Sequence, residues 1–440
     1  MNRQRLTGWG RTAPSYAHVV RPSSDEEVAH WLESSPVIAR GLGRSYGDAA
    51  QVGGGVVLDN RGLRGMGPIS PDGVVSVGAG LSLDEVIASA LPQGWFVPVT
   101  PGTRQVSVGG AIAADVHGKN HHRDGSFGDH VLEMHLVTPT GERTVSPTVD
   151  PDLFWATLGG MGLTGVVTRV TLRLMRVSTD RVLVDTDRFD TLDAVMSAMV
   201  EGDDSYRYSV AWVDCMTRGR SMGRAILTRG EHAESTESSP LLRAPRSALL
   251  KVPFSAPPGL LNPLSIRLFN EAWFRKAPRQ RREESQTLGA FFHPLDGVAD
   301  WNRLYGPRGF VQYQFAVSDA HADTVVKAIH TLSESGVPSF LAVLKRFGPG
   351  NSGPLSFPMA GWTLALDLPV GPARLPGVLD DLDDLVADAG GRIYLAKDAR
   401  LRPERLRAMY PRLDHFLEVK NRVDPEGHLT SDLARRLLLS

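Results

Sequence analysis

The chain of 440 residues has a single cysteine, Cys215, which excludes a disulfide framework and a zinc site built from cysteines. It also lacks any run of roughly 18 apolar residues, so we expect no helix to cross a membrane. Positive and negative charges nearly balance, with a formal net charge of −1 at pH 7. The overall charge therefore gives no indication of a nucleic acid partner.

The first twelve residues are polar and basic and lack an apolar core, which does not fit a secretory signal peptide. We therefore expect a protein that is cytoplasmic or lies peripherally at the inner membrane.

Glycine is abundant, with 45 residues, and its dense clusters lie in the first half of the chain. They fall at 41–55, 78–80, 102–128 and 159–165. Glycine lets the backbone adopt positive φ and approach a ligand closely. Successive N–H groups in such loops can then hold a pyrophosphate. No Gly-x-Gly-x-x-Gly stands at a strand-to-helix junction, so a Rossmann domain is not indicated.

Two patterns of secondary structure divide the chain near residue 176. Before it, short strands alternate with helices that begin at capping boxes, such as Ser82 with Glu85. After it, strands such as 310–317 and 362–368 alternate apolar and polar residues, and the helix at 375–389 has one apolar face. We expect an α+β fold of two domains, with an antiparallel sheet covered by helices in the second. The first domain is residues 1–176 completed by 392–440, and the second is residues 177–391.

The glycine loops at 41–48, 101–113 and 159–165 resemble those of the vanillyl-alcohol-oxidase type of flavoenzymes. Leu6 to Pro14, Arg40 to Asp48, His117 to His122, Tyr305 to Pro307, Gln312 to Phe315 and Ala396 to Asp398 extend the resemblance along nearly the whole chain. These segments are similar to a family within that type, the polyprenyl-phosphoryl-ribose oxidases of actinobacteria. The resemblance implies a PCMH-type FAD-binding fold with an antiparallel-sheet substrate domain.

The resemblance also implies a reaction. FAD would oxidise the C2 hydroxyl of decaprenylphosphoryl-β-D-ribose to the 2-keto sugar, the first half of an epimerisation that yields the arabinose donor for cell-wall arabinan. An NADH-dependent short-chain reductase would act on the keto product, and a quinone or oxygen would take the electrons. By the same resemblance, a periplasmic location is an alternative.

The resemblance assigns site residues by their positions. The flavin would be held by Arg40, Gly41, Gly43, Arg44, Ser45, Tyr46, Gly47, Pro101, Gly102, Thr103, Val108, Gly109, Gly110, Ala113, His117, Gly118, Asn120, His122, Gly162, Gly165 and Val166. The substrate would be bound by Gln312, Gln314, Lys345, Thr363, Ala365 and Lys397. Lys397, His117 and Tyr46 are the catalytic candidates, and each is a candidate to take the hydroxyl proton. We expect no metal site, because the histidines at 117, 121 and 122 lack zincin spacing.

Two departures from family patterns stand out. Covalent relatives have histidine in a Gly-x-Gly-His-Ser loop, where this chain has Arg44, so we expect FAD to be bound non-covalently. Mycobacterial members have cysteine at the position of Ala365 and asparagine at that of Thr363. The pocket therefore lacks the thiol, and activity should not depend on it because the flavin carries the redox chemistry.

Other functions remain open at this point. A soluble sugar, alditol or aldonolactone oxidase is one alternative, and a flavin-binding scaffold without activity is another. Residues 241–282 combine Pro, Leu, Phe and Arg and include Trp273 and Phe274. This stretch is either a surface connection with a basic face or a mobile interfacial segment that contacts anionic lipid.

Overall fold

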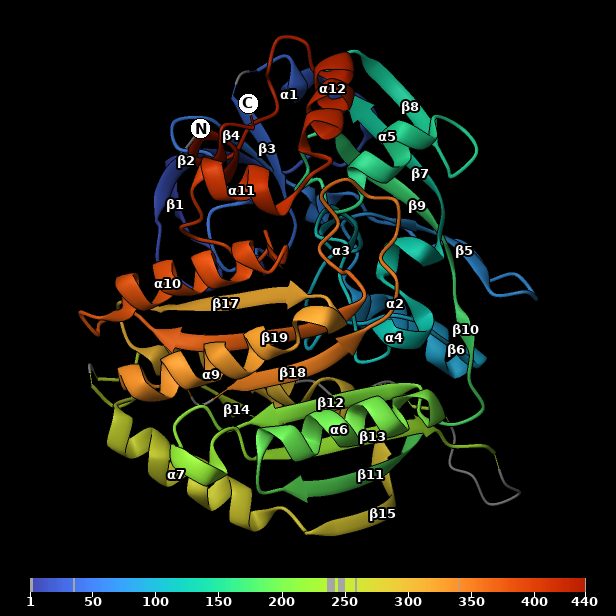
Figure 1. Ribbon diagram of the computed structural model, residues 1–440. Coiled ribbons are helices and arrows are strands. Elements are labelled where there is room, and N and C mark those ends of the chain that lie inside the picture. The colour runs from blue at the N-terminus through green and yellow to red at the C-terminus, as the bar shows by residue number, and fades with distance from the viewer. Residues whose placement is uncertain are drawn as a thin grey trace.

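The computed structural model describes residues 3–439 except 35, 236–241, 244–249, 258 and 340. The N-terminal part contains two four-stranded sheets, and the part that follows contains an eight-stranded sheet (Figure 1). Two small sheets of two strands each complete the described sheets. This arrangement is the mixed α+β fold predicted from the sequence.

The first four-stranded sheet has the order β1-β2-β4-β3. Its strands are β1 (Arg3–Leu6), β2 (Ser15–Val20), β3 (Val37–Arg40) and β4 (Val56–Asp59). Strands β2 and β3 both run parallel to β4, which requires a crossover between them. Helix α1 (Asp25–Leu32) makes this crossover. It is capped by Ser24, whose hydroxyl accepts a hydrogen bond from the amide of Glu27.

The second four-stranded sheet has the order β5-β9-β7-β8 and is antiparallel throughout. Its strands are β5 (Val74–Gly78), β7 (Val131–Thr138), β8 (Gly141–Val145) and β9 (Val166–Arg173). Strands β7 and β8 form a hairpin. Helix α2 (Leu83–Ala90) follows β5 and has both hydrogen bonds of the Ser82–Glu85 capping box.

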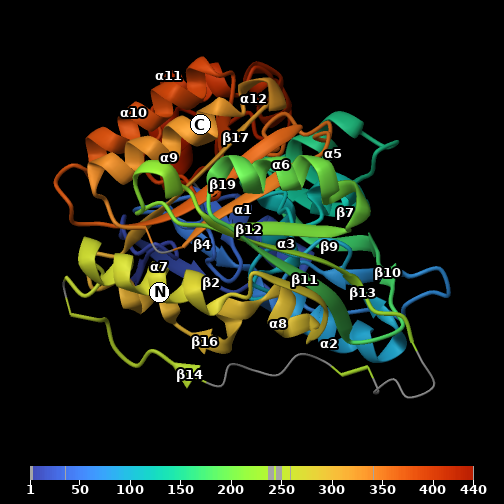
Figure 2. The same ribbon diagram turned by 60° about the horizontal axis from the view of Figure 1, so that its bottom comes forward.

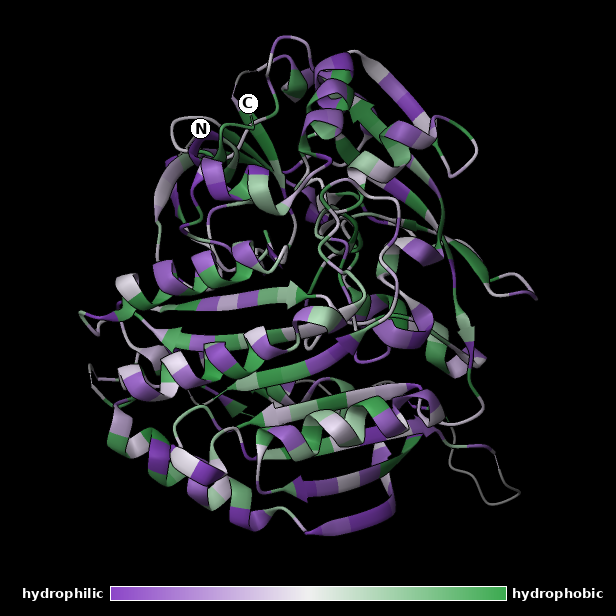
Figure 3. Ribbon diagram, viewed as in Figure 1, coloured by the Kyte–Doolittle hydropathy of each residue, from purple (hydrophilic) through white to green (hydrophobic). Residues whose placement is uncertain are grey.

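The large sheet has the order β15-β11-β13-β12-β18-β19-β17-β20, and every pair in it is antiparallel. Its strands are β11 (Arg181–Phe189), β12 (Tyr208–Val213), β13 (Ala225–His232), β15 (Gln280–Thr287), β17 (Phe310–Val317), β18 (Ala342–Phe347), β19 (Gly361–Pro369) and β20 (Arg392–Ile393). The edge strand β15 is hydrophilic, whereas β18 and β19 are largely hydrophobic (Figure 3). A charged edge of this kind discourages pairing with another chain.

Helices α6 (Leu192–Gly202), α9 (Asp323–Ser335) and α10 (Leu375–Asp388) cover one face of the large sheet (Figure 1). The other face is turned toward the N-terminal part. The chain then returns to that part through α11 (Pro403–Met409), α12 (Leu413–Val423) and α13 (Asp432–Leu437). The amide of Thr430 donates to the carbonyl of Val37, which ties this return to β3. The large sheet and the first part therefore enclose a space between them.

The stretch 241–282 is only partly described, and it contains a helix that the sequence pattern did not predict. Helix α7 (Pro263–Lys276) begins at Asn262, whose side chain accepts hydrogen bonds from the amides of Leu264 and Ser265. Figure 2 brings forward the side of the molecule on which α7 and the short strand β14 (Leu250–Lys251) lie. The stretch is therefore more than a surface connection.

Candidate active site

A cavity of about 660 Å³ lies between the glycine loops and the inner face of the large sheet. The loop after β3, the loop before α3 (Val108–Ala113) and the loop before β9 form one side of it. Strands β12, β13, β17, β18 and β19 provide the other side. Three loops that are far apart in the sequence thus meet at one place.

The glycine loops leave room for a ligand against the backbone. A Cβ atom on Gly102 would meet no protein atom within 4 Å, and Gly43 and Gly162 have φ values of +64° and +78°. Within the described part of the protein, no acceptor lies against the amide groups of Leu42 and Arg44. Free amide groups beside a glycine-lined cavity suit the pyrophosphate and flat ring of FAD.

Most of the predicted flavin residues line this cavity. These are Arg40, Gly41, Gly43, Arg44, Ser45, Tyr46, Pro101, Gly102, Thr103, Gly109, Gly110, Ala113, His117, Gly118, Gly162 and Gly165. Gly47, Val108, Asn120, His122 and Val166 lie behind its wall. Two of these side chains hold the loops in place: the Asn120 amide donates to the carbonyl of Pro98, and a ring nitrogen of His122 lies 2.9 Å from the carbonyl of Tyr206.

The arginine at the histidyl position of covalent relatives faces an aromatic ring. The guanidinium carbon of Arg44 lies 3.9 Å from the centre of the Trp9 ring. Burial lowers the pKa of Arg44, and nearby Asp296 opposes that shift. The guanidinium of Arg40 has a different role. It donates to the carbonyls of Ala50 and Thr7 and so stabilises the loop after β3.

The register of the large sheet places the predicted substrate residues on one face. Gln312 pairs with Asp367 and Gln314 with Ala365 between β17 and β19, and Lys345 on β18 pairs with Thr363. Side chains directly opposite each other in an antiparallel pair point to the same face. Gln312, Gln314, Lys345 and Ala365 accordingly line the cavity, whereas Thr363 is fully buried behind Gln314.

A chain of hydrogen bonds orients His117. The Thr363 hydroxyl donates to the carbonyl of Phe315 at 2.8 Å, so its oxygen is left to accept from the Gln314 amide at 3.1 Å. The same Gln314 nitrogen lies 3.0 Å from Nε2 of His117 and donates its second hydrogen there. His117 is therefore neutral, with its proton on Nδ1, and burial lowers the pKa of His117 well below its usual value. Nδ1 is buried and has no protein partner in the described part of the chain.

Three lysines line the cavity: Lys119, Lys345 and Lys397. Within the described residues, none of them has a carboxylate within 4 Å. Burial lowers the pKa of Lys119 to about 7 and that of Lys345 to about 8. Lys119 is anchored by donating its ammonium hydrogen to the carbonyl of Phe291. Cations held in such a place without a counter-charge indicate an anionic ligand.

Lys397 and Asp367 form a second polar group beside Tyr46. The Lys397 ammonium lies 3.8 Å from the centre of the Tyr46 ring. Burial lowers the pKa of Lys397, and the charge of Asp367 opposes that shift. Asp367 accepts hydrogen bonds from Gln312 and from the Tyr305 hydroxyl, and burial raises its pKa. Burial also raises the pKa of Tyr46 well above its usual value.

Comparison with known proteins decides the family. Residues 16–146 match the model of an FAD binding domain, and residues 378–437 match that of D-arabinono-1,4-lactone oxidase. The decaprenylphosphoryl-β-D-ribose oxidase of Mycolicibacterium smegmatis is 44% identical over 99% of this chain and 98% of its own length. The chain belongs to the decaprenylphosphoryl-β-D-ribose oxidase family. A Streptomyces coelicolor protein without a known function is 42% identical over 81% of this chain and all of its own length.

Membership in the decaprenylphosphoryl-β-D-ribose oxidase family makes the protein an FAD-dependent oxidoreductase. A more distant relative, cytokinin dehydrogenase 4 of Arabidopsis thaliana, is 34% identical over 38% of this chain and 37% of its own length. In the described part of the protein, no helix is long and apolar enough to span a membrane.

The sequence analysis did not identify several residues that line the cavity. Lys119 lies within the His117–His122 motif, and Tyr394 lies just before the Ala396–Asp398 motif, so both had a local signal. Asp367 does not line the cavity but hydrogen-bonds Gln312, which does, and it also had a local signal as a lone carboxylate in an apolar strand. Phe269 and Trp301 line the cavity from a helix and a short turn whose sequences carry no such signal.

Proposed function

We propose that the protein oxidises the C2 hydroxyl of decaprenylphosphoryl-β-D-ribose to the 2-keto sugar, as the first half of an epimerisation toward the arabinose donor for cell-wall arabinan. The M. smegmatis relative is named for this substrate. The observation that carries the proposal is the pair of cavity lysines Lys119 and Lys345, which have no carboxylate partner in the described part of the protein. A phosphodiester supplies the missing negative charge, whereas free sugars, alditols and aldonolactones are neutral.

FAD would lie along the glycine loops and would be held without a covalent bond, because Arg44 cannot form the histidyl linkage. When bound, FAD accepts the hydride that leaves the substrate carbon. The two four-stranded sheets with the C-terminal helices would form the FAD-binding domain, residues 1–176 and 392–440. Residues 177–391 would form the substrate domain.

Lys397 is the group that would take the hydroxyl proton. Nε2 of His117 is already occupied as an acceptor for Gln314, so His117 can only donate, through Nδ1. Tyr46 keeps its own proton, because burial raises the pKa of its hydroxyl. Burial lowers the pKa of Lys397, which makes its neutral amine available as a base.

Lys345 and Lys119 would bind the phosphate of the substrate. Both line the cavity, and burial and mutual repulsion lower the pKa of Lys119. A bound phosphate reverses that effect by favouring the charged ammonium groups. Gln312, Gln314 and Ala365 would complete the wall against the ribose, and Thr363 would act through Gln314.

The partners of the reaction follow from the proposed chemistry. A reductase that uses NADH would reduce the ketone on the opposite face, and a quinone or oxygen would reoxidise the flavin. A substrate with a long prenyl chain also calls for contact with a membrane.

Helix α7 is the surface that suits this membrane contact. Of the large exposed hydrophobic residues in the described chain, most lie between residues 250 and 273. Leu264 and Leu268 are 68% and 64% exposed on α7, among the exposed cations Arg267, Arg275 and Lys276. Phe274, which the sequence suggested as a lipid contact, is instead buried against Arg188 and Arg224. The leucines, and not Phe274, would enter the lipid.

The test of the proposed function is reduction of the flavin by substrate without oxygen. Decaprenylphosphoryl ribose should bleach the visible flavin absorbance of the purified protein. Ribose, ribitol and arabinono-1,4-lactone at equal concentration should leave it unchanged. Comparable bleaching by the lactone would instead favour an aldonolactone oxidase, the activity named by the model that matches residues 378–437.

A further inference from the structure

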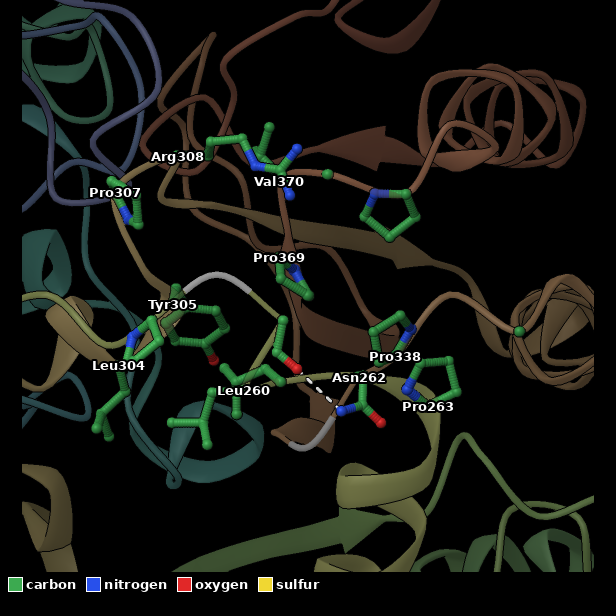
Figure 4. Close-up of a pocket in the computed structure, with 16 residues that line it drawn as sticks. Leu260, Asn262, Pro263, Leu304, Tyr305, Pro307, Arg308, Pro338, Pro369 and Val370 are labelled. Carbon is green, nitrogen blue, oxygen red and sulfur yellow. Dashed lines mark hydrogen bonds between the residues drawn. The ribbon is translucent and has the colours of Figure 1, made fainter.

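A second, smaller cavity lies at the start of α7, and its residues are not those of the FAD cavity. It has a volume of about 270 Å³ and opens between the turn before α7, the turn at 304–308 and the turn at 369–372 (Figure 4). We call it the proline cleft.

The proline cleft is lined by rings that carry no hydrogen-bond donor. Six prolines face it: Pro257, Pro263, Pro307, Pro338, Pro369 and Pro372. Proline has no backbone N–H, so an apolar chain beside these residues leaves no proline amide without a partner. Leu260, Leu261 and Leu304 extend the apolar lining.

Two polar side chains at the cleft, those of Asn262 and Tyr305, are already engaged with the protein. Asn262 caps α7 through its oxygen and donates from its nitrogen to the carbonyl of Gly259 at 2.9 Å (Figure 4). The Tyr305 hydroxyl donates to Asp367, on the side of the catalytic cavity. Arg308 is exposed at the rim. The interior of the cleft therefore offers little to a polar ligand and suits a hydrocarbon.

A cluster of aromatic side chains lies between the cleft and the catalytic cavity. Trp301 lines the cavity and Tyr305 lines the cleft, and their ring centres are 6.2 Å apart. Outside this cluster, α7 connects the two spaces: Phe269 and Trp273 line the cavity, and Leu260 lies at the cleft before the helix begins. The exposed side chains of Leu264 and Leu268 lie on the helix between these ends, so an apolar path runs over the surface from the cavity to the cleft.

We propose that the proline cleft holds part of the prenyl chain of the lipid-linked substrate. The chain leaves the catalytic cavity past Phe269 and Trp273 and follows the apolar path to the cleft. This inference rests on the proposed function, and it adds that the enzyme recognises the lipid as well as the ribosyl phosphate.

Binding of prenyl phosphates without sugar tests the inference apart from catalysis. The affinities of decaprenyl phosphate and geranyl phosphate for the flavin-loaded protein are measured by calorimetry in one detergent. Decaprenyl phosphate should bind at least about tenfold more tightly, because each buried methylene adds to its affinity. Equal affinities for the two phosphates would overturn the inference.

The variant Leu260→Asp/Val370→Asp places two charges in the cleft at positions that are exposed and half-buried. It should lose the preference for the long chain and keep its affinity for geranyl phosphate. Val200→Asp, at a residue of α6 that is 55% exposed, is the control and should bind as the wild type does. If the double variant loses flavin, Leu260→Asp alone is used, since that side chain is 51% exposed. A variant that keeps the long-chain preference contradicts the inference.

The proposed function is tested separately with geranylphosphoryl ribose, whose chain is too short to depend on the cleft. Oxidation of that substrate without a chain-length preference in binding would reject the cleft alone. A preference for the long chain without any oxidation would reject the proposed reaction and leave the lipid site in place.

Discussion

Single residues of a site can reflect the charge of its ligand. The cavity lysines are an example: Lys119, Lys345 and Lys397. A cation is costly to hold deep in a protein unless an opposite charge is near it. The described residues offer these lysines no carboxylate within 4 Å, and the cost appears as lowered pKa values for all three. An anionic substrate offsets that cost when it binds. The lysines of the unliganded site therefore indicate a negatively charged ligand.

Replacing Lys397 with alanine tests its role as the base. The variant should keep its FAD and its visible spectrum, while the rate of flavin reduction by substrate falls roughly 10²- to 10³-fold. Lys327→Ala, at an exposed lysine paired with Asp323 on α9, is the control and should reduce normally. Near-normal reduction in Lys397→Ala would remove this residue from the catalytic step.

The pH dependence of flavin reduction at saturating substrate is a second test at this scale. A base must be neutral, so the rate should fall as the pH drops through the pKa of Lys397. Burial and the charge of Lys345 place that pKa below 10.5, and the charge of Asp367 opposes the shift. The other titratable neighbours, Tyr46 and His117, stay neutral near pH 7.

In a plot of rate against pH, the fall in rate at low pH forms one limb of the curve. Two variants should move this limb in opposite directions. Asp367→Asn removes a negative charge that favours the ammonium form, so the limb should move to lower pH. Lys345→Met removes a positive charge that disfavours it, so the limb should move to higher pH. Shifts of the same sign in the two variants would show that the limb belongs to another group.

At the scale of elements, three faces of α7 lie in three different environments. Ile266, Asn270 and Phe274 pack into the protein, and the Asn270 amide donates to Asp214. Phe269 and Trp273 face the catalytic cavity, and Leu264 and Leu268 face solvent. One helix thus joins the core, the active site and the surface.

The variant Leu264→Glu/Leu268→Glu tests membrane contact without touching the core or the cavity. Wild-type protein should co-sediment with vesicles that contain anionic lipid at low salt, because each basic residue near the surface contributes about 1 kcal/mol. The variant should sediment several-fold less. Val149→Glu/Val200→Glu adds the same charge at residues that are 56% and 55% exposed elsewhere, and it should behave as the wild type does. Wild-type protein that stays in the supernatant would reject the membrane contact.

At the scale of the whole molecule, the cavity proposed for FAD lies between the two parts of the chain. The return of the C-terminal segment to β3 closes the N-terminal part, and the large sheet then covers the glycine loops. A ligand in this cavity stabilises both parts together.

Release of the flavin tests this arrangement. Acid precipitation should leave FAD in the supernatant, since Arg44 permits no histidyl bond, and flavin in the pellet would contradict non-covalent binding. The apoprotein should unfold at a lower temperature, and added FAD should restore the melting temperature. At a hundred times its Kd, free FAD stabilises the folded state by about 2.7 kcal/mol. A melting temperature that does not depend on FAD would argue against a site between the two parts.

The amino-acid sequence by itself determined the local structure and the kind of cofactor. Glycine spacing, the Ser82–Glu85 capping box and the alternation in 310–317 depend on neighbours a few residues away, so they can be read along the chain. Arg44 in place of histidine likewise needs no fold to predict that no histidyl flavin bond forms at that position. The family resemblance rests on motifs of this local kind.

Only the tertiary structure decided how the site works. Strand register brings Thr363 behind Gln314, and Gln314 then sets the proton of His117, although these residues are up to 246 positions apart. The sequence also does not show which face of α7 is buried, because hydrophobic residues lie all around the helix. Only packing decides which of them are buried. The physical reason is that local propensity depends on adjacent residues, whereas orientation in a site depends on contacts made after the chain has folded.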